Sequence, residues 1–237
     1  MGATMRRNKD RLYVGLYVRR GAVKLAGGED SSLTDRYHWA LLRGPKIEDE
    51  DTLLTKYHAT ESHNGSDKSD NNDNNENNGN SGSTASSPTE LSSTASSSTT
   101  SSSASYTYAE QTMPTYDLML LARVLVGKIR NPTRLETVLR GVPVPGAAAN
   151  LTDKEKLNIG SNSISWVQSA LDALAADAGG AMGKSSNLDW TAVRDAAMEY
   201  VEQKAQEHRY DGLAPVGQFD LAKPATFDLV QGREVSP

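Results

Sequence analysis

The sequence predicts an α+β fold in which an antiparallel sheet packs against helices from the C-terminal half. Two observations predict it. Short segments that alternate apolar and polar residues, as half-buried strands do, occupy the first half of the chain. Segments whose apolar residues recur at helical spacing all follow them. Strands first and helices later is an order typical of α+β domains.

Five strand candidates follow one another in the first half of the chain. Residues 11–19 place leucine and valine on one face and tyrosine on the other. Residues 37–43 and 56–60 come next, and the Gly-Pro and acidic run between them predict a turn. Residues 106–113 alternate apolar and polar side chains only weakly and are the fourth strand candidate. Residues 117–129 are strongly apolar, and their valines favour a buried strand, although a helix remains open.

Three later segments are predicted helices, each with a recognisable start. Asn131 is the N-cap of the first, a proline follows it, and Gly141 ends the helix. Asn162 caps the second, and Asp189 caps the last and longest. One more short strand is expected at residues 226–230. These helices supply the layer that covers the sheet.

Domain organisation follows from a local shortage of large apolar residues. Hydrophobic residues make up 37% of the 237 residues, and residues 62–105 consist of Asn/Asp runs followed by Ser/Thr runs. Such a segment buries too little apolar area to offset its chain entropy, so we expect a disordered insert. A phosphorylated regulatory loop is the alternative. We expect residues 1–10 to be a flexible N-terminus and residues 11–237 to be one α+β domain around the insert.

Charge and composition exclude several classes of protein. The net charge is −5 without an extended basic patch, which disfavours nucleic-acid binding. The chain has no cysteine, which excludes disulfides, thiolate zinc sites and a cysteine nucleophile. We see no transmembrane segment and no secretory signal, and therefore expect an intracellular, cytoplasmic protein. No cofactor is expected, and a metal site on His38 and His58 lacks a third ligand.

Two histidines and one serine are the candidate site residues. In a hairpin centred near Glu48, His38 and His58 lie nearly opposite each other on one face, with Cβ atoms about 5 Å apart. Ser163 lies in the first turn of a predicted helix, where N–H groups stabilise a developing anion. This pattern predicts a nucleophile, Ser163, with His38 as base and His58 as orienting partner. The alternative is structural: a capping serine and two half-buried strand histidines.

Several segments resemble a family of largely uncharacterised fungal proteins. They are LYVGLYVRRG, YHWALLRGPK, KYHATE, LARVLVGKI, SNSISWVQSALDAL and DWTAVRDAAMEYVEQK. In that family a YHWAL strand and a YHA strand precede an Asn-Cys-x-x-Trp-Val helix start. The order of two histidine strands and a nucleophile helix also resembles circularly permuted papain-like folds, such as lecithin retinol acyltransferase-like and NlpC-like thiol hydrolases.

The resemblance implies an acyltransferase or hydrolase scaffold for a small-molecule, lipid or peptide acyl substrate. It gives Ser163 the place of the cysteine, His38 that of the base and His58 that of the third member. Serine departs from the family pattern, so we expect weak or no turnover. A paralogue that has lost activity, an active serine variant and a deliberate replacement all remain open. A second hypothesis is a non-catalytic binding or scaffold protein that uses its pocket, its insert and an exposed apolar stripe on the last helix.

Overall fold

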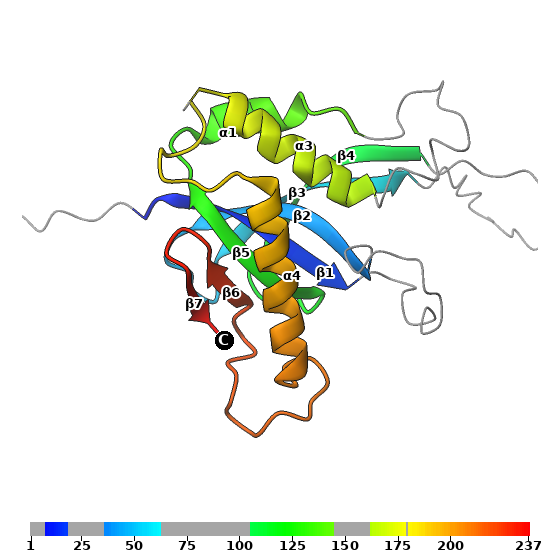
Figure 1. The fold of residues 1–237 in the computed structure, drawn as a ribbon, viewed down its shortest axis with the longest axis vertical. Coiled ribbons are helices and arrows are strands. Elements are labelled where there is room, and N and C mark those ends of the chain that lie inside the picture. The colour runs from blue at the N-terminus through cyan, green and yellow to red at the C-terminus, as the bar shows by residue number, and fades with distance from the viewer. Residues whose placement is uncertain (1–7, 19–35, 63–104, 145–161, 179) are drawn as a thin grey trace, which may run out of the picture. The chain divides into compact units, whose positions relative to one another are not determined.

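The computed structural model describes residues 8–18, 36–62, 105–144, 162–178 and 180–237 (Figure 1). Within these ranges it contains seven strands in one sheet and three helices. The predicted α+β class is confirmed, and the sheet is mostly antiparallel. The predicted disordered insert lies outside the described residues, apart from its two end residues.

The sheet is built mainly from strands that are neighbours in the sequence. The strands are β1 (Asp10–Val18), β2 (Tyr37–Pro45), β3 (Leu53–Ser62), β4 (Ser105–Pro114), β5 (Leu120–Lys128), β6 (Ala225–Asp228) and β7 (Arg233–Ser236). Their order across the sheet is β4-β3-β2-β1-β5-β6-β7. All neighbouring pairs are antiparallel except β5 and β6, which run parallel. Residues 117–129, for which the sequence favoured a strand but left a helix open, contain the strand β5.

Three residues that the sequence analysis assigned to flexible segments belong to strands in the structure. Asp10, assigned to the flexible N-terminus, is the first residue of β1, because its carbonyl accepts the Ile129 N–H at 3.0 Å and its carboxylate binds Arg43 at 2.7 Å. Ser62 and Ser105, assigned to the insert, are paired ends of β3 and β4. Backbone pairing thus extends the sheet into residues whose polar side chains did not predict it. The strand β7 was also not predicted, since its segment is short and mostly polar.

The helices are α1 (Pro132–Arg140), α3 (Asn162–Ala176) and α4 (Trp190–Gln206). Two predicted caps are present: the Asn131 side chain accepts the Arg134 N–H, and the Asp189 side chain accepts the Ala192 N–H. The third differs, because Asn162 is already the first residue of α3. No helix in the described ranges combines the length and the apolar character that crossing a membrane requires.

The two faces of the sheet carry different sets of side chains. On one face, α3 packs against β2 and β3, and α4 packs against β5 and β1 (Figure 1). This face forms the main core, which includes Leu12, Val14, Trp39, Leu41, Val124, Trp166, Leu171, Val193 and Val201. The other face carries a smaller buried cluster of Tyr13, Tyr17, Ala40, Leu42, Leu54, Met113 and Leu120. Alternation along each strand separates the two sets.

The apolar side of α4 is buried in the main core. Its buried residues include Val193, Ala197, Tyr200 and Val201. The hypothesis of a binding protein expected these side chains to form an exposed stripe. That surface is therefore not available to a partner.

The smaller cluster lies on the concave side of a curled sheet. Tyr17 on β1 and Met113 on β4 are in contact, with the phenol oxygen 3.2 Å from the sulfur. In a flat sheet, strands three places apart are separated by about 14 Å, so the sheet must curl toward this face to bring them together. The curl encloses the side chains of β1 to β4 that point away from the helices.

Candidate functional site

His38 and His58 meet on the concave face. His38 Nε2 lies 2.9 Å from His58 Nδ1, and the ring planes are nearly perpendicular, at 86°. The register pairs Leu41 with Tyr57, and its extension places His38 opposite Thr60. His58 is therefore a diagonal neighbour of His38. The predicted register is wrong by two residues, an offset that keeps both histidines on one face because side chains alternate with a period of two.

The strands β2 and β3 separate beside this histidine pair. Residues 41–43 of β2 pair with residues 55–57 of β3, and the ladder stops there. Both strands nevertheless continue, β2 back to Tyr37 and β3 forward to Ser62. The histidine pair thus lies beside the end of the backbone ladder between β2 and β3, and we call this break in the ladder the opening of the sheet.

Ser163 reaches the same opening from the helical side. It is the second residue of α3, and its Oγ accepts the Trp39 N–H at 3.3 Å. This N–H belongs to the part of β2 beyond its last pair with β3. The Trp39 nitrogen is bonded to the carbonyl carbon of His38, so Ser163 Oγ lies within about 6 Å of the His38 Cα. Ser163 Oγ therefore contacts the β2 backbone next to His38, from the face opposite to the two imidazole rings.

His58 is neutral at physiological pH. It is 8% exposed, and burial, together with the neighbouring charges of Lys56 and His38, lowers its pKa to about 3. A neutral imidazole has one donor and one acceptor nitrogen. The bond between the histidines can therefore run either way, and in one tautomer His38 Nε2–H donates to His58 Nδ1.

Lys56 is a further member of this cluster that the sequence analysis did not single out. It is 9% exposed and lies on the same face of β3 as His58, with Nζ 3.7 Å from the centre of the Tyr17 ring. Burial lowers the pKa of its ammonium group, and the charge of Asp117 opposes this shift. In the described part of the chain no ion pair joins Lys56 to a carboxylate. The available signal was its two-residue spacing from His58, which puts both on one face of a strand.

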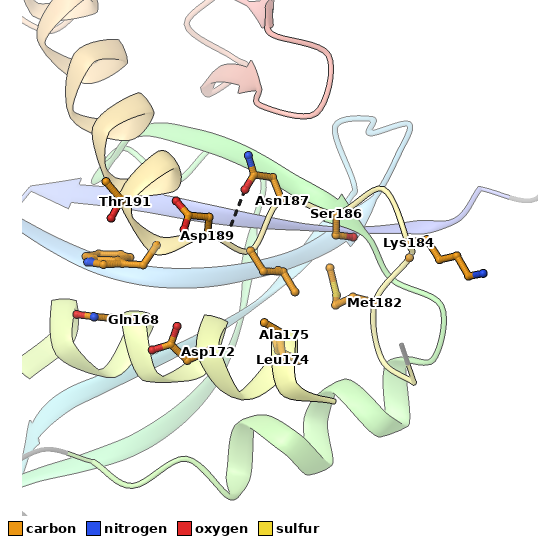
Figure 2. A pocket seen from close by; sticks show the side chains of 13 residues that line it. Gln168, Asp172, Leu174, Ala175, Met182, Lys184, Ser186, Asn187, Asp189 and Thr191 are labelled. Carbon is orange, nitrogen blue, oxygen red and sulfur yellow. Dashed lines mark hydrogen bonds between the residues drawn. The ribbon is translucent and has the colours of Figure 1, made fainter. Parts of the chain in front are cut away.

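A surface pocket of about 740 Å³ lies between α3 and the segment that leads into α4. Figure 2 shows Gln168 and Asp172 of α3 across the pocket from Asp189 and Thr191 at the start of α4. The Asp189 N–H donates to the Asn187 side chain at 3.2 Å, which shapes this rim. The lining mixes polar and apolar side chains and comes from α3 and from the segment that leads into α4, not from the histidine cluster.

A second pocket lies at the start of β1 and the end of β5. Neither pocket is lined by His38, His58 or Ser163. Across the described ranges, no three His, Cys, Asp or Glu side chains are grouped so that they can hold a metal ion. The described residues bring imidazole, hydroxyl and ammonium groups to the cluster.

The described residues define an α+β domain with two histidines and a serine gathered at an opening in its sheet. The chain belongs to a family described as a family of unknown function (DUF6914), whose model matches residues 9–87 and 80–236. No curated protein and no solved structure matches the chain. The family assignment thus covers nearly the whole chain and carries no activity with it.

Proposed function

We propose that the chain is a circularly permuted papain-like scaffold of the hydrolase or acyltransferase type, with Ser163 in the place of the nucleophile. One observation carries the proposal. The bond between His38 and His58 and the contact of Ser163 with the Trp39 N–H converge on one opening between β2 and β3. A base, an orienting partner and a hydroxyl at a helix start are the groups that nucleophilic catalysis uses.

In the proposed chemistry His38 is the base. Neutral His58 accepts the His38 Nε2–H, which leaves a lone pair on His38 Nδ1. Ser163 Oγ bonds to the carbonyl carbon of an ester or amide, and its proton moves to that nitrogen. The carbonyl carbon then releases the alcohol or amine, which takes the proton from His38. Water or an acceptor alcohol reverses the sequence and frees the serine.

The start of α3 supplies stabilisation for negative charge. N–H groups in the first turn of a helix have no partner inside that helix. We assign the Ser163 N–H to the oxyanion that forms on the substrate. The Trp39 N–H donates to Oγ itself, and so favours charge on the attacking atom.

Three features support weak or absent turnover with serine. The pKa of a hydroxyl is far above that of a thiol, so a helix start and one imidazole activate serine much less than cysteine. Neutral His58 stabilises a protonated His38 less than a carboxylate does. Ser163 is 5% exposed, which restricts access of the small-molecule, lipid or peptide acyl substrate that we propose.

The proposal is tested by acylation with p-nitrophenyl acetate, followed by intact mass and peptide mapping. We expect Ser163→Cys to gain one acetyl group much faster than the wild type, and the additional change His38→Ala to remove that gain. The chain contains no cysteine, so the introduced thiol is the one thiol present. Ser169→Cys, an exposed position on the same helix, is the matched control, and its labelling should not depend on His38.

Two results would contradict parts of this account. If Ser163→Cys keeps the wild-type unfolding midpoint and forms no adduct, the site is not a nucleophile site. If wild-type Ser163 is acylated at the rate of the thiol and loses this with His38→Ala, the protein is an active serine enzyme. The second result would agree with the proposed site residues and contradict the expectation of weak turnover.

A further inference from the structure

Three segments far apart in the sequence bring basic side chains to the second surface pocket, which has a volume of about 820 Å³. Lys9 precedes β1, Lys128 ends β5, Arg130 follows it, and Lys184 lies between α3 and α4. The net charge of the whole chain is −5. The positive charge of this pocket is therefore a local feature created by the fold.

Three lysines of the pocket have no carboxylate partner among the described residues. Among the described residues that line it, the only carboxylate is Asp10, which is engaged by Arg43 at 2.7 Å. Repulsion from the ammonium group of Lys9 lowers the pKa of Lys128. In the resolved ranges no ion pair joins Lys9, Lys128 or Lys184 to a carboxylate. Uncompensated charges of one sign around a hollow attract the opposite charge.

Hydrogen bonds fix the backbone segments that carry Lys9 and Lys184. Asn8 makes two hydrogen bonds with the backbone of Ile47, at 2.9 and 3.0 Å, which fix the segment that carries Lys9. The Gly183 N–H donates to the Lys128 carbonyl at 2.8 Å. A Cβ at position 183 would lie 3.2 Å from that oxygen, so glycine permits the close approach that brings Lys184 to β5. The backbone segments that carry Lys9 and Lys184 are thus fixed near the end of β5.

We propose that this pocket binds a phosphate group with at least two negative charges, as a phosphomonoester or diphosphate. Lysine ammonium groups bind phosphate as point charges, and Lys9, Lys128 and Lys184 bring three of them to the pocket. Cations from three segments surround a multiply charged group, whereas a single carboxylate would leave most of the charge unbalanced. The inference is independent of the acyl chemistry proposed above.

The test uses the full chain and inorganic pyrophosphate, measured by isothermal titration calorimetry at low salt. We expect saturable binding of one equivalent that weakens as salt is added. Lys128→Ala and Lys184→Ala should each weaken it roughly fivefold, the effect of losing one charge close to the ligand. Lys223→Ala is the matched control, since Lys223 is exposed and paired with Asp220 at 2.9 Å, and it should bind like the wild type.

A parallel experiment uses neutral vesicles with and without phosphatidic acid. Binding of both pyrophosphate and the acidic vesicles, weakened by the same two variants, would assign the phosphate to a lipid headgroup. Pyrophosphate binding alone would assign it to a soluble ligand. No saturable binding of pyrophosphate, equal weakening by Lys223→Ala, or binding to vesicles alone would each overturn the proposal. Unfolding midpoints of the variants confirm that each remains folded.

Discussion

Two buried cations lie on the concave face of the sheet, and they have very different partners. Arg123 on β5 binds both carboxylate oxygens of Glu48, at 2.8 and 2.7 Å, and the Thr226 hydroxyl at 2.9 Å. Lys56 on β3 lies over the Tyr17 ring without a carboxylate partner among the described residues. A buried charge with a full set of partners is typical of a structural role, and a poorly paired one with a shifted pKa is typical of a functional site.

The difference between the partners of Arg123 and Lys56 matches the pairing of β2 and β3, which ends partway along these strands. Glu48 lies on the connection between β2 and β3, at the end where these strands pair, and Arg123 ties that connection to β5. Lys56 pairs with Leu42 inside the ladder, and its ammonium group reaches Tyr17, whose partner on β2 is His38 at the end where the strands separate. The closed end is held by a complete ion pair, and the open end carries the neutral histidine pair and Ser163.

The largest expected effect is at the closed end. Glu48→Ala leaves the Arg123 guanidinium buried without its counter-ion, so we expect a loss of about 3–5 kcal/mol in the free energy of unfolding. Urea titration measures it. Asp195→Ala breaks an exposed pair with Arg194 and should cost less than about 1 kcal/mol. Equal losses would show that Arg123 and Glu48 do not hold the sheet closed.

The next effect is a pH dependence at the open end. The pKa of His58 is lowered to about 3, so between about pH 6.5 and pH 3 the folded chain binds fewer protons than the unfolded chain. Stability therefore falls as the pH falls through this window, by at most about 1.4 kcal/mol per pH unit from this group, and is insensitive to it above the window.

Urea titrations at a series of pH values measure this slope. His58→Asn should flatten it relative to the wild type. An unchanged slope in His58→Asn would mean that His58 is not held neutral by burial.

Removing the charge of Lys56 should change the free energy of unfolding in the opposite direction to removing Glu48. Lys56→Met retains an apolar side chain of similar length, and we expect stability to rise, or to change by less than about 1 kcal/mol. The charge of Lys56 lowers the pKa of His58, so the variant should raise that pKa in an NMR titration. A loss above about 2 kcal/mol would show that Lys56 has a strong partner.

The smallest expected effects are the coupling energies of the two cation–π contacts. A double-mutant cycle with Tyr17→Leu and Lys56→Met should give a coupling of about 1 kcal/mol, because Lys56 is desolvated. The same cycle with Tyr13→Leu and Arg123→Met should give about half, since Glu48 already offsets that charge. Equal couplings would remove the contrast between the two cations.

Local signals predicted most of the elements. The caps Asn131 and Asp189 are in the predicted places, and the alternation of β1 separates its two faces as expected. The register of β2 and β3 and the early end of their ladder were not predictable, because they depend on where α3 inserts Ser163. Short local patterns do not contain that information.

The candidate site was partly accessible from the sequence. A shared face for His38 and His58 follows from the two-residue period, whereas the approach of Ser163 from the other face requires the tertiary fold. The basic pocket was not predictable, since its basic residues are Lys9, Lys128, Arg130 and Lys184, which lie in three distant segments of the chain. Charge that is scattered in the sequence gathers only when β1, β5 and the segment before α4 pack together.

The most direct measurement of the central claim is the pH dependence of alkylation of Ser163→Cys by iodoacetamide. The account predicts a thiol pKa well below the usual value of about 8.5, raised toward that value by His38→Ala. The control Ser169→Cys should show a thiol pKa of about 8.5 that does not respond to His38→Ala. The same behaviour in Ser163→Cys would contradict the account.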